Sequence, residues 1–324
     1  MRKKKKYVVG IDLGGTKIMV GLLNKKFRVI SYEKIKTEAS KGEKYFLKTI
    51  FDALEEILSE EKVKSSEIQG IGIGCPGVMD EKRRVVVSSP NLAFLNHFPL
   101  SKKIESHFDR PAVLENDVNA GLYGEHQFGA AKGYSSVVGI FLGTGIGGGL
   151  ILDHKLYRGA SGAAGEIGHL ILDVHGSLCG CGKRGCLEAI ASRLALASEA
   201  AVLAYKQKAP KLMQLVGTDI SKIKSNAMAK SIASGDHALL EMVHQKSELL
   251  GLAMAHTVNL LNPELIVLGG GVLEAMEKYI LPKAEAAMKK YAMTPLAREV
   301  KVVAAKLQDF AVLMGAAKLA WDEV

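Results

Sequence analysis

Long apolar runs are missing from this sequence of 324 residues. No segment approaches the ~18 uninterrupted apolar residues that a membrane-spanning helix needs. The first residues, MRKKKKYVVGIDLGG, also lack the apolar region and cleavage site of a signal peptide. Low-complexity linkers are missing too, so any domain border must be a hinge within compact structure. We therefore expect a soluble, cytoplasmic protein without a membrane partner.

Cysteine is scarce, and its distribution is uneven. Of the four cysteines, Cys179, Cys181 and Cys186 fall within eight residues, whereas Cys75 stands alone. Such crowding argues against the disulfide framework of a secreted domain and favours a metal site. Cys75 is expected to be a core or loop thiol.

The charge balance is basic, with 43 Lys plus Arg against 34 Asp plus Glu and a formal net charge of +9. Four of the positive charges, Lys3 to Lys6, lie at the beginning of the sequence, where a solvated basic tail is the simplest interpretation. The remainder is mildly basic, as suits a protein that handles anionic metabolites, and no nucleic-acid partner is expected. The length predicts roughly two domains, and the 48% hydrophobic content is typical of globular proteins.

Two segments of the chain share a strand, glycine turn, strand pattern. They are residues 7–24, YVVGIDLGGTKIMVGLLN, and residues 137–152, VVGIFLGTGIGGGLIL. Shifting the first segment by 129 positions aligns six identities in seven places, starting with Val8 on Val137. We infer an internal duplication, and therefore two related halves with a cleft between them.

The remaining periodicity indicates an alternating α/β chain. Helices are expected at residues 43–60, 238–261 and 311–321, and strands at 70–73, 112–115 and 265–268. The strand at 112–115 ends in Glu115-Asn116-Asp117, and polar groups at such a strand end face a cleft. The expected domains are a smaller lobe, 1–117, to which the terminal helix within 311–324 returns, and a larger lobe, 118–310.

The first glycine turn combines a carboxylate, two glycines, a hydroxyl and a cation within six residues. Glycines let backbone N–H groups approach phosphate oxygens, while the carboxylate can hold Mg²⁺ through water. An ordinary hairpin turn is the alternative. The candidate nucleotide-binding residues are Asp12, Gly14, Gly15, Thr16 and Lys17.

The second turn, residues 143–149, has five glycines in seven residues, more than a tight turn requires. Gly143, Thr144 and Gly145 are its candidate phosphate contacts. The run also contains a dinucleotide-type pattern, but a strand and loop follow it instead of the helix of a Rossmann fingerprint. The chain has no Walker A sequence.

A third glycine run lies between a strand and a helix and consists of Gly269, Gly270 and Gly271. It is either a phosphate-binding site at a helix N-terminus or a tight turn.

The cysteine cluster predicts a structural zinc site. Cys179, Cys181 and Cys186 lie on a glycine-rich loop, and His169 lies ten residues upstream. Three sulfurs and one imidazole complete a closed tetrahedral shell, which leaves no open position for catalysis. Acidic candidates lie near it: Glu166 precedes His169, and Glu188 follows Cys186 by two residues.

Together these motifs resemble the ROK family of repressors and sugar kinases, and most closely its bacterial glucokinases. The resemblance covers essentially the whole chain. Its most specific part is Glu166-Ile167-Gly168-His169 followed by Cys179-x-Cys181-Gly182-x-x-Gly185-Cys186-x-Glu188, which matches the family's zinc signature.

The resemblance implies an actin-like, hexokinase-like (ribonuclease H-like) duplicated fold of two lobes that close over ATP-Mg²⁺ and a hexose. It also implies that the protein is a homo-oligomer, a dimer or a tetramer. Family repressors carry a DNA-binding segment ahead of the first glycine turn; six residues precede Tyr7 here, so that function is not expected. The implied sugar contacts are Asn91, Asn116, Asp117, Glu166, His169 and Glu188, with His169 serving zinc and sugar together.

The function expected from this combination is ATP-dependent phosphorylation of the 6-hydroxyl of a hexose, with glucose as the first choice. Asp117 is the candidate catalytic base. N-acetylmannosamine, N-acetylglucosamine, fructose, mannose and allose remain alternative substrates. A sugar-sensing regulator without turnover and a dinucleotide-dependent oxidoreductase are the alternatives from other classes.

Overall fold

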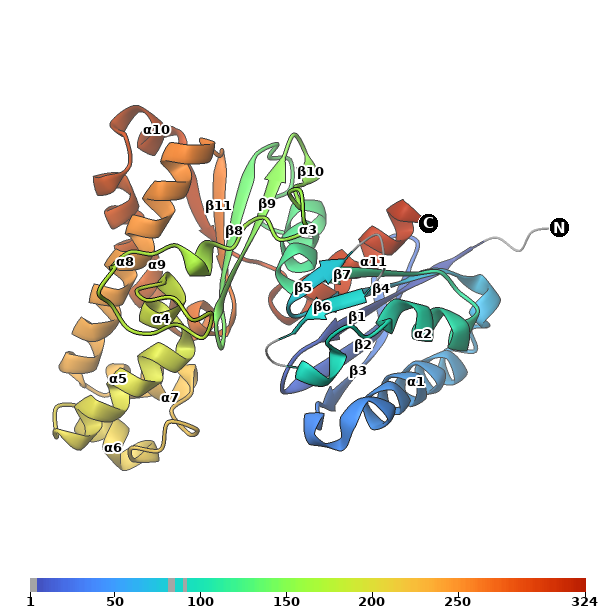
Figure 1. Cartoon of the computed structure of the whole chain (residues 1–324), viewed down its shortest axis with the longest axis horizontal. Coiled ribbons are helices and arrows are strands. Elements are labelled where there is room, and N and C mark those ends of the chain that lie inside the picture. Colours follow the sequence, from blue (N-terminus) through green and yellow to red (C-terminus); the bar gives the residue numbers. More distant parts are fainter. Residues whose placement is uncertain (1–4, 81–84, 90–91) are drawn as a thin grey trace. The chain divides into compact units, whose positions relative to one another are not determined.

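The computed structural model of the protein describes residues 5–80, 85–89 and 92–324. The chain forms two compact units, each built on a five-stranded sheet (Figure 1). The first unit comprises Met1–Gly133, Leu156–Ala164 and Asp309–Val324, and the second comprises Tyr134–Lys155 and Gly165–Gln308.

The sheet of the first unit has the strand order β3-β2-β1-β4-β7. Strand β2 runs antiparallel to both of its neighbours, β1 and β3, whereas β4 is parallel to β1 and β7 is parallel to β4. A separate pair, β5 and β6, is antiparallel. The strands are β1 (Tyr7–Leu13), β2 (Lys17–Asn24), β3 (Val29–Lys36), β4 (Ile68–Cys75), β5 (Val78–Asp80), β6 (Val85–Ser88) and β7 (Ala112–Asn116).

The sheet of the second unit, β10-β9-β8-β11-β12, repeats this plan. An antiparallel hairpin, β8–β9, is followed by two parallel strands, β11 beside β8 and β12 beside β11. The hairpins β1–β2 and β8–β9 are the two segments whose sequences match, so the sheet order agrees with the inferred duplication. The strands are β8 (Val137–Leu142), β9 (Ile146–Leu152), β10 (Lys155–Leu156), β11 (Leu265–Gly269) and β12 (Lys301–Ala304).

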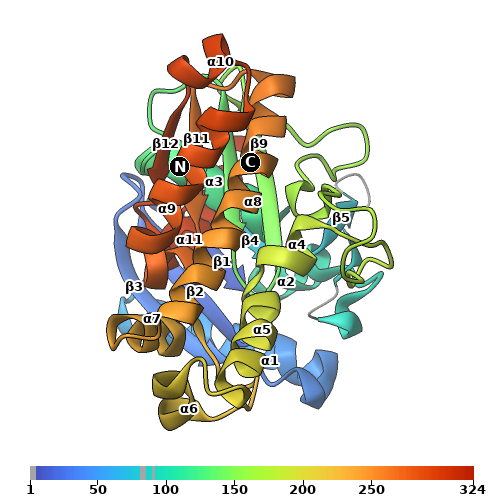
Figure 2. The ribbon, with the colours of Figure 1, turned by 90° about the vertical axis from the view of Figure 1, so that its left-hand side faces the viewer.

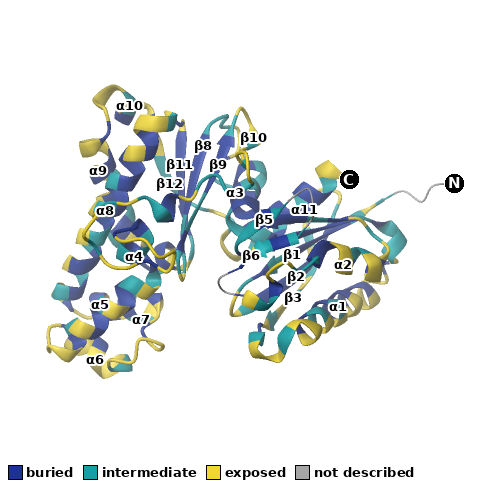
Figure 3. Ribbon diagram, viewed as in Figure 1, coloured by how far each residue is buried: buried dark blue, intermediate teal, exposed yellow. Residues whose placement is uncertain are grey.

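Helices cover both faces of the first sheet. On one face, α1 (Gly42–Glu60) buries Phe46, Ile50 and Ile57, whose spacing keeps them on one side of the helix, and α2 (Leu100–Phe108) joins the same core. On the other face, α11 (Ala311–Glu323) packs Leu313 and other apolar side chains against β1 and β2. The outer side of α1 is largely exposed (Figure 3).

Glycines in the strands, which have no side chain, allow α11 to lie very close to the sheet. A Cβ added at Gly10 would lie 2.1 Å from the carbonyl oxygen of Leu313, and one added at Gly72 would lie 1.8 Å from that of Ala316. Any larger residue at either position would push the helix away, so these glycines fix the separation of the layers.

Two long helices, α8 (His237–Leu261) and α9 (Gly271–Tyr291), pack side by side in the second unit (Figure 2). Helix α8 ends at Asn262, which adopts the left-handed conformation with φ 45° and is followed by Pro263. Helix α9 is kinked at Met276. The other helices are α4 (Leu187–Ala191), α5 (Arg193–Tyr205), α6 (Pro210–Val216), α7 (Ser225–Ala233) and α10 (Thr294–Glu299).

The structure divides the chain at residue 133, not at the border expected near residue 117. The physical reason is α3 (Asp117–Phe128), which packs against α11 through Ala120 within the first unit. A Cβ at Gly315 of α11 would lie only 1.7 Å from the carbonyl oxygen of Ala120, so the two helices touch backbone to backbone. Among the described residues, no helix has the length and hydropathy to cross a membrane.

Candidate functional site

The first glycine turn joins β1 to β2 and is tightly closed. The Gly14 amide donates to the Lys17 carbonyl at 2.9 Å, and the Thr37 hydroxyl donates to the Gly14 carbonyl at 2.7 Å. Thr16 also accepts from the Thr37 amide at 3.0 Å. The turn is therefore a hairpin that Thr37 supports from outside, and its contact with phosphate stays a prediction.

Asp12 lies at the end of β1, beside Gly74 of the parallel strand β4. Burial, followed by the neighbouring Asp117 carboxylate, raises the pKa of Asp12 from 3.8 to about 7, while Lys17 acts in the opposite direction. A nearby cation would stabilise the charged form of Asp12, which burial and the neighbouring carboxylate disfavour. The Asp12 carboxylate is chemically suited to Mg²⁺, which prefers oxygen ligands.

Lys17 does not pair with Asp12; its ammonium donates to Asp309 at 2.6 Å. Lys34 donates to the second oxygen of Asp309 at 3.0 Å. These bonds, led by the one from Lys17, hold the pKa of Asp309 below its usual range. Sequence reasoning missed Asp309, because it lies 292 positions from Lys17 and carries no motif of its own.

Asn116 and Asp117 occupy the junction between β7 and α3. The Asn116 side-chain oxygen accepts from the amides of Val118 and Asn119, which makes it the N-cap of α3. Its amide nitrogen donates to the Gly77 carbonyl at 3.0 Å. Asp117 is the first residue of the helix and is partly exposed. Asp12 and Asp117 thus lie at the ends of β1 and β7, on either side of β4, and close enough for the Asp117 carboxylate to raise the pKa of Asp12.

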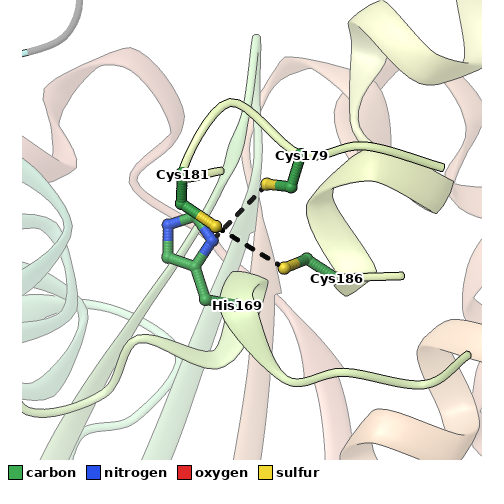
Figure 4. A group of neighbouring side chains, drawn as sticks. All are labelled: His169, Cys179, Cys181 and Cys186. Carbon is green, nitrogen blue, oxygen red and sulfur yellow. Dashed lines mark hydrogen bonds between the residues drawn. The ribbon is translucent and has the colours of Figure 1, made fainter. Parts of the chain in front are cut away.

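The four residues expected to bind zinc lie together in the second unit, with their side chains pointing toward one another (Figure 4). One ligand atom from each of His169, Cys179, Cys181 and Cys186 falls within 4.8 Å of all the others. His169 Nδ1 lies 3.7 Å from Cys179 Sγ, and Cys181 Sγ lies 3.7 Å from Cys186 Sγ. Tetrahedral zinc with ~2.3 Å bonds to sulfur separates its sulfur ligands by about 3.8 Å, so the donor set fits this metal.

Two of the expected sugar contacts border this cluster. His169 turns its Nε2 toward Glu166 Oε2, 3.9 Å away, while its Nδ1 faces Cys179. Glu188 uses one carboxylate oxygen to accept the Ile146 amide at 3.0 Å, and its other oxygen lies 3.6 Å from Cys179 Sγ. Glu188 therefore connects the cysteine cluster to the second glycine turn.

The second turn is held from several sides. The Gly143 amide donates to the Gly145 carbonyl at 2.9 Å, and Arg193 Nη2 donates to the Thr144 hydroxyl at 3.2 Å. A Cβ at Gly145 would lie 2.2 Å from the Glu188 carboxylate, so a larger residue there would displace this carboxylate from the Ile146 amide. Arg193 is a further residue that sequence reasoning missed; its position two residues after a short helix gives no signal.

The third glycine run adjoins the second turn. Gly269 ends β11, Gly270 is the N-cap of α9 with φ 87°, and Gly271 begins the helix. A Cβ at Gly270 would lie 2.5 Å from the carbonyl oxygen of Leu142, the residue before Gly143. Both glycine runs of the second unit thus lie at adjacent strand ends, next to a long helix whose free N–H groups favour anions.

The expected site residues accordingly form one group in each unit. The first contains Asp12, Gly14, Gly15, Thr16, Lys17, Asn116 and Asp117, and the second contains the metal cluster with Glu166, Glu188 and both later glycine runs. Asn91, an expected sugar contact, lies outside the described residues.

Comparison with known proteins agrees with this architecture. The fold is the two-lobed, actin-like fold of hexokinase type, as the structures it resembles show. The chain belongs to the ROK family, whose model matches residues 8–323.

Individual relatives fall into two functional kinds. The glucokinase of Thermotoga maritima is 31% identical over 98% of both chains. A ROK family glucokinase from Streptomyces griseus, solved in complex with glucose and AMPPNP, is 32% identical with a TM-score of 0.85 and covers 98% of this chain and 99% of its own. A xylose repressor of Caldicellulosiruptor bescii is 30% identical over 95% of this chain and 76% of the repressor.

Proposed function

We propose that the protein is an ATP-dependent sugar kinase that phosphorylates the 6-hydroxyl of a hexose, with glucose as its preferred substrate. The observation that carries the proposal is the closeness of Asp117, at the start of α3, to Asp12, which lies just before the first glycine turn and whose pKa is raised by burial. A base beside a cation-binding carboxylate is the arrangement that phosphoryl transfer to an alcohol requires. Similarity to the two glucokinases supports the choice of glucose.

In the proposed reaction, Asp117 accepts the proton of the sugar hydroxyl. The hydroxyl oxygen attacks the γ-phosphorus of ATP, and ADP leaves. A base in this role contributes about 10²- to 10⁴-fold in rate, or roughly 3 to 5 kcal/mol. The Gly14 and Gly143 amides close the two turns, and the other amides of residues 14–17 and 143–145 hold phosphate oxygens. Lys17 exchanges Asp309 for a phosphate. Mg²⁺, held through Asp12, would neutralise charge on the phosphates.

The sugar, in this proposal, is held by Asn91, Asn116, Glu166, His169 and Glu188. His169 faces the metal cluster through Nδ1 and keeps Nε2 for a sugar hydroxyl. Zinc held by His169 and the three cysteines fixes the shape of this loop and takes no part in the chemistry. Gly269, Gly270 and Gly271 provide a seat for the nucleotide at the N-terminus of α9.

The test is Asp117→Asn, which keeps the size of the side chain and removes the base. A coupled assay of ADP release should show glucose phosphorylation reduced at least about 100-fold, with ATP affinity nearly unchanged. Asp109→Asn is the matched control, because the Asp109 side chain is fully exposed in the same unit. Near-native turnover by Asp117→Asn would refute the base assignment. A panel of hexoses and phosphoryl donors, polyphosphate included, decides the substrates.

A sugar-responsive regulator is the second candidate, because a xylose repressor matches 95% of this chain. Such a protein would bind the sugar and release no ADP. Calorimetric binding of glucose combined with the absence of turnover across the hexose panel would favour it over the kinase.

A further inference from the structure

Arg158 lies on a short segment with an unusual place in the chain. The segment Leu156–Ala164 belongs to the first unit, whereas the residues immediately before and after it belong to the second. Within it, the Ala164 amide donates to the Arg158 carbonyl at 3.0 Å, and Gly159 and Gly162 adopt positive φ values of 72° and 79°. The segment is therefore a compact loop with a defined backbone, and it needs an attachment to the first unit.

The Arg158 guanidinium supplies that attachment through two carboxylates. Its Nε donates to Glu115 Oε2 at 2.6 Å, and its Nη2 donates to Glu323 Oε1 at 2.9 Å. The two partners differ in environment: the Glu115 side chain is 5% exposed and that of Glu323 is 43% exposed. Since water screens exposed pairs, the bond to Glu115 is the stronger constraint.

Glu115 also organises the helix start that carries Asp117. Its other oxygen, Oε1, accepts from the Asn116 amide at 2.9 Å and from the Asn119 side-chain amide at 3.0 Å. One carboxylate therefore ties together the end of β7, the first turn of α3 and the guanidinium of Arg158. A shift of Glu115 would move the residues on both sides of Asp117.

The loop that carries Arg158 is followed in the chain by another candidate site residue. The loop that Arg158 anchors ends at Ala164, and the chain continues through Gly165 directly to Glu166, an expected sugar contact. Gly165 and Glu166 belong to the second unit, where Gly165 lies against Gly148 of β9, so the constraint from Arg158 acts within the first unit, on the helix start that carries the proposed base.

We propose that Arg158 and Glu115 are positioning residues for phosphoryl transfer, an inference that rests on the proposed function. They act through the residues on either side of Asp117, which they hold in the geometry that transfer requires, and not on a substrate directly. Because rate depends steeply on the placement of reacting groups, a loosened Glu115 lowers kcat more than it raises KM. An ion pair that served folding alone would lower stability and leave kcat unchanged.

The kinetic experiment uses the full chain with Arg158→Met, Glu115→Gln and Arg158→Lys, and Glu323→Gln as the matched control that removes only the exposed half of the interaction. At a temperature where each variant is folded, we expect kcat to fall about 10- to 100-fold in Arg158→Met and Glu115→Gln. Glu323→Gln should stay within about 2-fold, and Arg158→Lys should recover part of the loss. The double variant Arg158→Met/Glu115→Gln should be no slower than the worse single variant, because both remove one interaction.

Hydrogen exchange of the same proteins measures positioning without turnover. Peptides covering residues 115–122 and 156–164 should exchange faster in Arg158→Met, and as in the wild type in Glu323→Gln. If the wild type releases no ADP, the proposed function fails while these peptides still test the positioning. If Arg158→Met and Glu115→Gln keep the kcat of the wild type, the inference is wrong. If the wild type is inactive, unchanged hydrogen exchange in both variants would overturn the inference instead. Should Arg158→Met not fold, Glu115→Gln and Arg158→Lys provide the same comparison.

Discussion

Replacing Asp12 with asparagine should change how the stability of the protein depends on pH. Burial, with the Asp117 carboxylate as the second cause, raises the pKa of Asp12 from 3.8 to about 7 in the folded protein. Between these two values the folded protein binds a proton that the unfolded chain has released. The stability contributed by this proton is present at low pH, declines as the pH rises toward 7, and is lost above it.

The magnitude follows from the pKa difference. Each pH unit inside the window changes the free energy of unfolding by about 1.4 kcal/mol, so raising the pH from 5.5 to 7 costs the wild type about 2 kcal/mol. Asparagine does not ionise and carries no such cost. The stability of Asp12→Asn relative to the wild type should therefore rise by about 2 kcal/mol over this interval.

The assay is urea unfolding of both proteins at pH 5.5, 6.2 and 7, without Mg²⁺ or nucleotide. The difference between the two proteins cancels the titration of the histidines. Asp52→Asn, on α1 and with a side chain 57% exposed, is the control for the substitution itself. Mg²⁺ added at pH 7 should stabilise the wild type more than Asp12→Asn, because only the wild type offers the carboxylate. If the difference in free energy of unfolding between the wild type and Asp12→Asn is the same at all three pH values, the reasoning is refuted.

Three further outcomes follow from the structure. Gly315→Ala should cost about 3 kcal/mol or more of unfolding free energy in urea, because its Cβ would lie 1.7 Å from the carbonyl oxygen of Ala120; Gly180→Ala, which meets no atom within 4 Å, should cost less than about 1 kcal/mol. Removal of metal by a strong chelator should raise the KM for hexose before that for ATP, and a metal-free preparation with full activity would contradict the structural role of zinc. Glu264→Gln should lower the free energy of unfolding at pH 7 by less than about 1 kcal/mol, because the carboxylate accepts the Ser136 amide at 2.9 Å but is screened by solvent. Bonds of this kind hold the pKa of Glu264 below its usual 4.5. That difference should shrink as the pH falls below about 4.5, which unfolding curves at pH 3.5 and 7 would show.

Local pattern predicted much of the fold. The match between residues 8–14 and 137–143 indicated two related hairpins, and both became the centres of sheets with the same strand order. The helix expected at 43–60 is found at Gly42–Glu60, because its apolar side chains repeat at helical spacing. The domain border was misplaced because a helix that follows a strand carries no mark of which sheet it packs on. Only the contact of α3 with α11, far away in sequence, decides that.

The candidate site was predictable where its residues lie close together in a short sequence motif. The metal cluster required only the spacing of three cysteines and a histidine, and the four side chains do lie together. Long-range pairs were not predictable: Arg158 is 43 positions from Glu115, in a loop without periodicity. The residues around an isolated arginine or aspartate in the sequence do not indicate which side chain it will pair with. The roles of the individual site residues stay predictions.

The close fit of α11 against Gly10 and Gly72 bears on how the protein is made. Helix α11 is translated after the whole second unit, so during synthesis one face of the first sheet stays uncovered while residues 134–308 leave the ribosome. The unit whose strands emerge first is thus completed second, the reverse of the usual N-terminal to C-terminal order. Until α11 docks, the nascent sheet carries exposed Val8, Met19 and Leu23, the surface that a chaperone would have to shield.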